Sequence, residues 1–377
     1  MTVPGGRRRR RIAALVTALA AVLALLAGEA YLRLTSPPVS LARRTGAGEH
    51  RNPMEGWAVI DAFSAYRHRP GVALEGKTVN RHGFVSTPEV PLEKPPGTVR
   101  LLFLGESSTA GSGVGLADRE TWPWQTAEML RQRIGREVDF LNGGASGYTT
   151  FESYGRLWSR DRHFSPDVVI VMHGWNELQY FARVDALLAW RRLEDGSWSF
   201  EAARVPGSYP PWPVDRLIGW SQLLTRSRLA VARFAGSEYD TAGGGAPRRE
   251  LDRRGLAVFA THLELIGHLC ETIGARLFVV KQPTLMIPGG SPEHRRRCRF
   301  NYHGLDYEGR VAAMAAIHRT IDESVAPEVV IDLTPISGRL DLFHDAVHPT
   351  PEGATEMARR VAARLAETLG PASAPGG

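Results

Sequence analysis

Residues Val99 to Gly105 form an apolar stretch, interrupted only by Arg100, that ends in a cluster of small polar residues. A run of this length without polar alternation is typical of a strand that is buried on both faces of a parallel sheet. In such sheets, ligand sites lie beyond the carboxyl ends of the strands. The run therefore predicts an α/β fold, and it places the hydroxyl of Ser107 at the edge of a rigid sheet, facing a crevice.

Four further strands are predicted along the chain, at Val138–Leu141, Val168–Met172, Arg276–Val280 and Val329–Ile331. Helical patterns occur between and after the strands, at residues 120–133, 151–160, 256–270, 311–321 and 351–369. The first three strands each end in a polar loop that contains glycine. This alternation predicts a parallel, doubly wound sheet.

Five consecutive arginines, Arg7 to Arg11, precede an uncharged apolar stretch from Ile12 to Gly28. A basic segment followed by an apolar stretch is typical of a signal peptide or a signal anchor. Extension to Leu34 makes the stretch long enough for a bilayer, which needs roughly 20 residues. The small-residue site Gly28-Glu29-Ala30 is a weak cleavage site, which favours a membrane anchor over a cleaved, secreted form. The positive-inside rule then places the arginines in the cytoplasm and the rest of the chain outside it.

The basic character of the chain comes mainly from this amino terminus. The net charge is +6, and Arg7 to Arg11 supply five of these charges, so the remaining chain is nearly neutral. A neutral body does not predict a nucleic-acid-binding surface. Cys270 and Cys298 fit one disulfide or two free thiols equally well. No Cys/His spacing typical of a metal site occurs, and no metal or organic cofactor is expected.

These features divide the chain into five parts. We expect a cytoplasmic basic segment at residues 1–11, a membrane anchor at 12–34 and a stalk with a lead-in at 35–96. The main α/β domain follows at 97–370, and a disordered tail at 371–377. Residues from about 180 to 249 interrupt the alternation of strands and helices and are rich in Trp and Arg. Two roles explain this insertion equally well: it forms a wall or lid over the substrate, or it is a surface loop that does not contact the substrate.

Asp345 and His348 stand just before the last predicted helix. A carboxylate three residues before a histidine can fold back onto the imidazole and fix its tautomer, which leaves the other ring nitrogen to accept a proton. A serine hydroxyl becomes an effective nucleophile when such a base takes its proton. Ser107, Asp345 and His348 therefore supply the parts needed for acyl transfer, with Ser108 as the alternative nucleophile.

Acyl transfer also needs donors for the negative oxygen of the tetrahedral intermediate. The candidates are the backbone N–H groups of Ser107 and Gly147 and the side-chain amide of Asn176. Gly147 and Asn176 are each also explained as turn residues. Asp345 and His348 are also explained as a capping pair for the last helix.

Four short motifs at these positions resemble those of the SGNH hydrolase superfamily, also called GDSL-type esterases and lipases. They are Gly105-Glu106-Ser107, Asn142 to Gly147, Gly174-Trp175-Asn176-Glu177 and Asp345-Ala346-Val347-His348. The resemblance implies a three-layer α/β/α sandwich of flavodoxin-like type with a central, mostly parallel sheet. It implies Ser107 as the nucleophile, Asp345 and His348 as its partners, and Ser107, Gly147 and Asn176 as the oxyanion hole.

Glu106 and Glu177 stand where this superfamily usually has Asp. Both keep the charge, so the departure concerns loop geometry rather than the chemistry. The apolar stretch followed by Glu29 and Arg33 resembles membrane-anchored bacterial members.

The leading interpretation is an extracytoplasmic, membrane-anchored serine esterase that forms an acyl-enzyme on Ser107. Its substrate would be an ester of a lipid, a glycan or a small molecule. An acyltransferase that moves acetyl groups on cell-surface glycans would use the same residues, because only the acceptor differs. A non-catalytic binding module that retains the fold is the third interpretation.

Overall fold

The computed structural model describes residues 5–36, 39, 41, 56–113, 115–182, 190–192, 198–200, 212–234, 251, 253–298 and 302–370. The expected tail, residues 371–377, lies outside the described residues, as does most of the insertion. The chain forms two compact units, one of residues 1–53 with 204–239 and one of residues 54–203 with 240–377.

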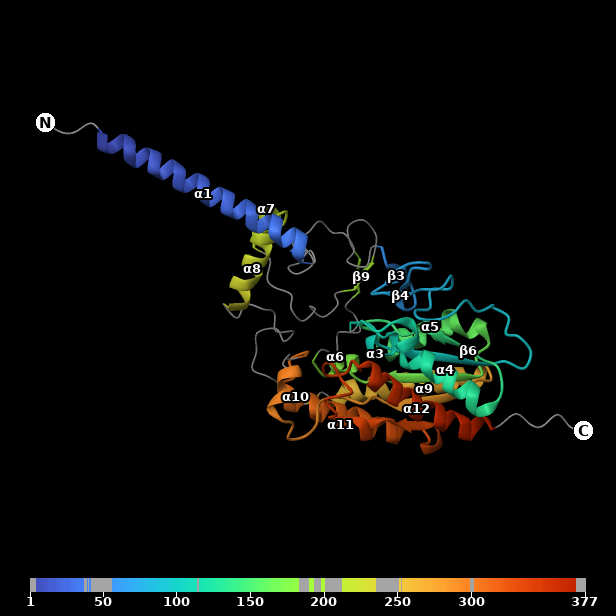
Figure 1. Cartoon of the computed structure of the whole chain (residues 1–377). Helices are drawn as coiled ribbons and strands as arrows, with labels where there is room; N and C mark the ends of the chain where they lie inside the picture. Colours follow the sequence, from blue (N-terminus) through green and yellow to red (C-terminus); the bar gives the residue numbers. More distant parts are fainter. Residues whose placement is uncertain are drawn as a thin grey trace, which may run out of the picture. The chain divides into compact units, whose positions relative to one another are not determined.

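A five-stranded sheet forms the centre of the larger unit (Figure 1). Its strands are all parallel and lie in the order β11-β10-β7-β5-β6. They are β5 (Val99–Gly105), β6 (Val138–Asn142), β7 (Val168–His173), β10 (Arg276–Lys281) and β11 (Val330–Asp332). This is the strand order of flavodoxin-like doubly wound folds. The predicted parallel sheet is confirmed.

Helices cover both faces of this sheet and complete three layers. On one face α4 (Trp122–Ile134) packs against α12 (Pro351–Leu369). On the other, α9 (Arg253–Thr272) contacts both α5 (Thr150–Ser159) and α11 (Tyr307–Ser324). Right-handed crossovers explain why the helices lie on different faces. The chain moves across the sheet in one direction from β5 to β6 and in the opposite direction from β7 to β11, so the connecting helices lie on opposite faces.

Strand β5 is held by apolar packing on both of its faces. Val99, Leu101 and Phe103 pack into the same core as α4 and α12, whereas Leu102 and Leu104 face α5 and α9. Every residue of the strand is buried. Burial of each such Leu or Phe side chain contributes roughly 1.5–3 kcal/mol. The end of β5 is therefore a rigid support for the residues that follow it.

Residues 56–96, expected to belong to a stalk and lead-in, are folded onto the larger unit. They contain two hairpins, β1 (Ala58–Asp61) with β2 (Ala65–His68) and β3 (Ala73–Leu74) with β4 (Lys77–Thr78). The Tyr66 hydroxyl donates to the carbonyl of Ser146, and the Tyr148 hydroxyl donates to the carbonyl of Tyr66. The buried side chains are spaced irregularly here, so sequence periodicity did not reveal the packing.

The smaller unit contains α1 (Gly5–Thr35), α7 (Asp215–Ile218) and α8 (Gln222–Phe234). The part of the insertion between residues 204 and 239 therefore belongs with the amino-terminal helix and not with the sheet. The remaining short elements are α3 (Ser107–Ala110), α6 (Gln179–Ala182), β8 (Trp190–Arg192), β9 (Trp198–Phe200) and α10 (Pro292–Arg297).

Two described helices are long and apolar enough to cross a membrane, at residues 12–35 and 253–273. The second is α9, which packs Phe259, Leu263 and Ile266 into the cores of the larger unit. The apolar window of the first is not buried at all. Only α1 therefore has the character expected of a membrane anchor.

Candidate active site

Ser107 is the first residue of α3 and is separated from the end of β5 by Glu106 alone. Gly105 makes this abrupt turn possible, because a Cβ atom there would lie 2.2 Å from Oγ1 of Thr109 and 2.7 Å from the carbonyl oxygen of Met172. Ser107 is half-buried, whereas Ser108 is buried and accepts a hydrogen bond from Gln282. The geometry therefore favours Ser107 over Ser108 as the nucleophile.

The structure brings Ser107, His348 and Asp345 into one chain of hydrogen bonds. Nε2 of His348 lies 2.9 Å from Oγ of Ser107, across 241 residues of sequence. Nδ1 of the same ring lies 2.8 Å from Oδ2 and 3.0 Å from Oδ1 of Asp345. This is the geometry in which imidazole can take the serine proton.

Asp345 is held in its ionised form. Burial alone would raise its pKa, but the hydrogen bonds and charge of His348 and the N–H groups of Val347 and His348 outweigh it and lower the pKa below the usual range. The ionised carboxylate keeps the proton of His348 on Nδ1, which leaves Nε2 as the acceptor that faces Ser107. The last helix has its own N-cap, Thr350, so Asp345 and His348 are not needed for capping.

The three oxyanion candidates lie beyond the ends of β5, β6 and β7. The N–H of Ser107 is at the start of a helix, where it has no intrahelical acceptor. Gly147 has a φ of +81°, is exposed, and has open space where a Cβ atom would be. Asn176 begins η3 (Asn176–Leu178), and its amide nitrogen donates to the carbonyl of Tyr148 at 2.9 Å.

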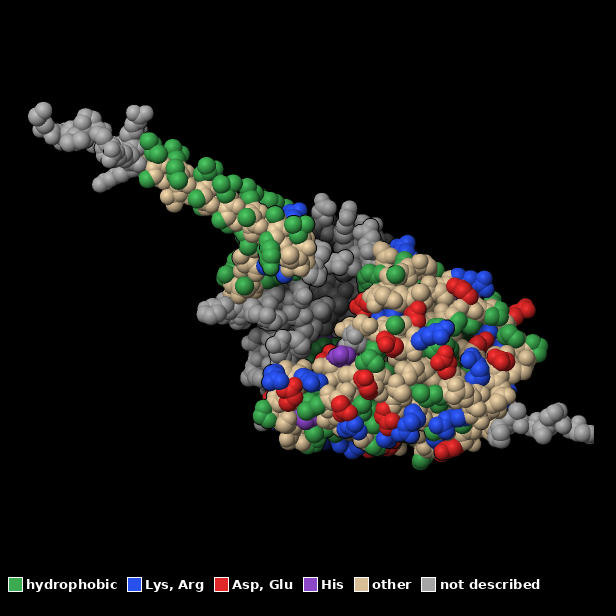
Figure 2. All heavy atoms as spheres, viewed as in Figure 1, with side chains coloured by type: hydrophobic (Ala, Val, Ile, Leu, Met, Phe, Trp, Pro, Cys, Tyr) green, Lys and Arg blue, Asp and Glu red, His purple; other side chains and the backbone are tan. Residues whose placement is uncertain are grey.

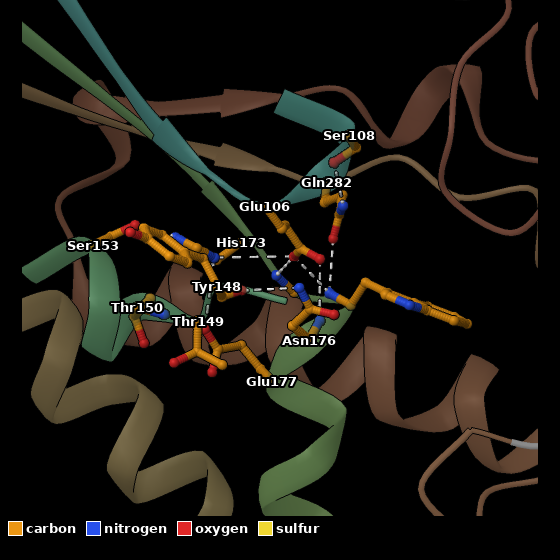
Figure 3. A network of polar contacts seen from close by, with 12 residues as sticks. Glu106, Ser108, Tyr148, Thr149, Thr150, Ser153, His173, Asn176, Glu177 and Gln282 are labelled. Atoms are coloured by element: carbon orange, nitrogen blue, oxygen red, sulfur yellow. Dashed lines mark hydrogen bonds and ion pairs between the residues drawn. The ribbon is translucent and has the colours of Figure 1, made fainter. Parts of the chain in front are cut away.

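A buried carboxyl group joins the serine loop to the asparagine loop (Figure 3). Oε1 of Glu106 accepts hydrogen bonds from the N–H groups of Gly174 and Trp175, and Oε2 accepts one from Asn176, at 3.0 to 3.2 Å. Gln282 accepts a further bond from Trp175 at 2.8 Å. Burial raises the pKa of Glu106 to about 8, although the three N–H groups oppose this shift. Glu106 therefore fixes the relative positions of the nucleophile and Asn176.

A second buried carboxyl group, that of Glu177, lies beside the first. Glu177 accepts a hydrogen bond from the N–H of Thr150 at 2.7 Å and so connects the loop after β7 to the start of α5. His173 lies between the two acids, with Nδ1 4.0 Å from Glu106 and 3.9 Å from Glu177. Its Nε2 is hydrogen-bonded to Ser153, and burial lowers its pKa to about 3. His173 is thus a neutral structural residue.

Tyr302 also contacts the candidate oxyanion donor, and sequence analysis did not identify it. Its hydroxyl donates to Oδ1 of Asn176 at 2.9 Å, and its ring stacks on Trp175 with centroids 4.5 Å apart. Tyr302 lies in a tight turn closed by two hydrogen bonds with Leu305. No motif or spacing marked it, because the contact joins positions 126 residues apart.

Cys270 and Cys298 are both buried free thiols and form no disulfide with each other. Among the described residues, no group of three or more His, Cys, Asp or Glu is placed to hold a metal ion.

A doubly wound sheet with a Ser–His–Asp arrangement at the carboxyl ends of its strands defines a class of serine hydrolases. A family model described as the GDSL-like lipase/acylhydrolase family matches residues 103–355. The chain belongs to this family, and it is an ester-hydrolysing enzyme.

Solved structures of similar fold include several esterases. A lipase from a goat rumen metagenome is 13% identical, with a TM-score of 0.42, and the match covers 71% of this chain and 97% of that one. An acetyl xylan esterase is 12% identical with a TM-score of 0.40, and the match covers 71% of this chain and 100% of that one. A lipase/acylhydrolase from Enterococcus faecalis is 15% identical with a TM-score of 0.39, and the match covers 73% of this chain and 100% of that one. No curated protein matches the chain.

Proposed function

We propose that this protein hydrolyses carboxylic esters through an acyl-enzyme on Ser107. The observation that carries the proposal is the hydrogen-bonded series from Ser107 through His348 to Asp345. Nε2 of His348 takes the hydroxyl proton as Oγ attacks the ester carbonyl, and it then protonates the leaving alcohol. Water attacks the acyl-enzyme in the second half of the cycle, with His348 again as the base.

Negative charge develops on the carbonyl oxygen during both attacks. The N–H groups of Ser107 and Gly147 and the side-chain amide of Asn176 are the donors proposed to receive it. Loss of one such donor lowers the rate by roughly 10²–10³. Because Glu106 links the first and third of these donors, the site is preorganised before substrate binds.

The test is labelling of the full-length protein in detergent by a fluorophosphonate probe, together with hydrolysis of p-nitrophenyl esters of increasing chain length. We expect labelling and turnover in the wild type, and the loss of both in Ser107→Ala with the fold intact. Labelling without turnover would favour transfer to another acceptor. Absence of labelling in the folded wild type would refute the serine mechanism.

We further propose that α1 anchors the enzyme in a membrane and that the larger unit lies on the extracytoplasmic side. The described helix from Ile12 to Thr35 has 24 residues, which is long enough to span a bilayer with its polar carboxyl end at the interface. The arginines from Arg7 to Arg11 precede it, which by the positive-inside rule keeps the amino terminus in the cytoplasm.

Intact mass and membrane extraction test this anchoring. We expect a membrane-bound chain of 41.4 kDa that resists an alkaline carbonate wash. A mature chain beginning at Tyr31 would show that the helix is a cleaved signal, and release by carbonate would exclude a spanning helix.

A further inference from the structure

The insertion contributes a helical hairpin, residues 212–234, that packs on the end of α1. The carboxylate of Glu29 accepts hydrogen bonds from the N–H groups of Gln222 and Leu223, at 3.0 and 2.8 Å, and from the hydroxyl of Ser221 at 2.8 Å. These groups form the start of α8, where helix N–H groups lack intrahelical acceptors. Glu29 on α1 therefore caps α8 across more than 190 residues of sequence.

Further contacts join the same two segments. Arg33 pairs with Glu29 at 2.6 Å and donates to the carbonyl of Trp220 at 2.7 Å. The side-chain amide of Gln222 exchanges two hydrogen bonds with the backbone of Val39, at 2.8 and 3.0 Å. Cleavage after Ala30 would remove Glu29 and leave the start of α8 without its cap. The carboxyl end of α1 is thus part of a folded unit.

The hairpin is also fixed internally. Asp215 and Arg228 form a buried ion pair at 3.0 Å, with each side chain about 1% exposed. The guanidinium of Arg228 lies 3.6 Å from the centre of the Trp212 ring, and the N–H of Trp212 donates to Asp215 at 2.8 Å. These contacts hold α7 against α8 and set which side chains face outward.

The outward-facing side chains are largely apolar. Leu217 and Trp220 are each 71% exposed, next to the residues that bind Glu29 and Arg33. The other exposed apolar residues of the hairpin are Trp212, Val214, Leu224 and Val231. Figure 2 shows hydrophobic side chains on this hairpin as well as along α1. Large apolar side chains grouped in this way mark an interaction surface.

We propose that the hairpin of residues 212–234 lies in the headgroup region of the bilayer that α1 crosses. The uncharged run from Ile12 to Gly28 has 17 residues, about 25 Å of helix, which is shorter than a hydrocarbon core of about 30 Å. The hairpin docks at Glu29, directly after this run, and so lies at the edge of the hydrocarbon. Trp is enriched at that depth, and interfacial residues compensate for a short span. The inference rests on the proposed anchoring by α1, and it is independent of the esterase mechanism.

Spin labels on the full-length protein in nanodiscs of phosphatidylcholine and phosphatidylglycerol test this placement. Labels are attached at Leu217→Cys and Trp220→Cys, with Leu19→Cys in α1 as the lipid reference and Leu92→Cys, 50% exposed in the larger unit, as the aqueous reference. The two native thiols do not interfere, because both are buried and burial raises the pKa of each to about 12. Collision with oxygen and with a nickel chelate reports depth, and circular dichroism confirms that each variant is folded.

We expect labels 217 and 220 to be accessible to oxygen and protected from nickel, at a depth between those of Leu19 and Leu92. Nickel accessibility equal to that at Leu92 would overturn the proposal while leaving the anchor intact. Protection from both reagents would indicate a protein contact and would also overturn it. An aqueous signal at Leu19 would instead refute the anchor itself.

Discussion

At the scale of single residues, Tyr302 determines which way the side-chain amide of Asn176 faces. Asn176 meets the carbonyl of Tyr148 on one side, and a carbonyl only accepts, so the NH₂ group must face it. Oδ1 therefore faces Tyr302, which has to donate. Burial, together with Glu106 and Glu177, raises the pKa of the Tyr302 phenol, so it keeps its proton. In the proposed mechanism, the second amide hydrogen of Asn176 is the one that meets the substrate oxygen.

We expect Tyr302→Phe to lower kcat about three- to tenfold and to leave KM nearly unchanged. A hydrogen bond contributes about 0.5–1.5 kcal/mol, and 1.36 kcal/mol corresponds to a factor of ten in rate. The effect belongs to kcat because the amide is proposed to act on charge that develops in the transition state. Steady-state kinetics on a p-nitrophenyl ester measure both constants.

Two controls separate this role from a general loss of packing. In an Asn176→Ala background, Tyr302→Phe should have little further effect, because the phenol acts through the amide. Tyr307→Phe removes a hydroxyl that is hydrogen-bonded to the backbone of Ile287, and it should leave kcat unchanged. Independent, multiplicative effects of the Asn176 and Tyr302 substitutions would contradict the assigned role.

At the scale of secondary-structure elements, α5 and the β1–β2 hairpin meet at Gly155. A Cβ atom at this position would lie 1.8 Å from the carbonyl oxygen of Phe63, which no real contact allows. The ring of Phe63 also packs on Trp158 of the same helix, with centroids 5.3 Å apart. Packing therefore requires glycine at a position where helix propensity alone favours Ala by about 1 kcal/mol.

We expect Gly155→Ala to lower the free energy of unfolding of the larger unit by about 1–3 kcal/mol, because the helix and hairpin must move apart. Gly267→Ala in α9 is the matched comparison, since its Cβ would meet only Leu277, at 3.8 Å. That variant should be stabilised by up to about 1 kcal/mol. Denaturant unfolding measures both, and a stabilised Gly155→Ala would show that the close approach does not exist.

At the scale of the whole molecule, buried titratable groups limit the pH range of stability. Burial lowers the pKa of His68 and His173 to about 3. As the pH falls below about 6.5, these histidines bind protons in the unfolded chain but not in the folded chain, which lowers the stability of the fold. Burial raises the pKa of Glu177 well above its ordinary range. The unfolded chain therefore releases a proton that the folded chain keeps as the pH rises above about 4.5. Stability should be greatest at weakly acidic pH.

Glu177→Gln should reduce the loss of stability on the alkaline side. The Gln oxygen can still accept the hydrogen bond from Thr150, and position 177 then has no carboxyl group that can ionise. We expect its Tm to fall less than that of the wild type between pH 5.5 and 8.5. Glu323→Gln, at an exposed position, should keep the wild-type slope. Equal slopes for all three proteins would show that Glu177 does not set the alkaline limit.

The parallel sheet, and the grouping of polar residues at one of its edges, could be predicted from the amino-acid sequence. Buried parallel strands require continuous apolar runs, and the carboxyl ends of parallel strands meet at one edge. The sequence therefore predicts that Ser107, Gly147 and Asn176 lie near one another. Asp345 and His348 are three residues apart, and a contact of that kind is encoded locally. The family motifs add to this reading, while the roles of these residues in catalysis stay predictions.

The side chains that orient those residues, and the unit to which the insertion belongs, could be seen only in the folded protein. Tyr302 on Asn176, Glu106 on the loop after β7, and Glu29 on α8 are single contacts between segments far apart in sequence. No periodicity or motif encodes such contacts, because they depend on how whole elements pack. For the same reason residues 204–239, which in sequence interrupt the α/β domain, fold with α1 instead.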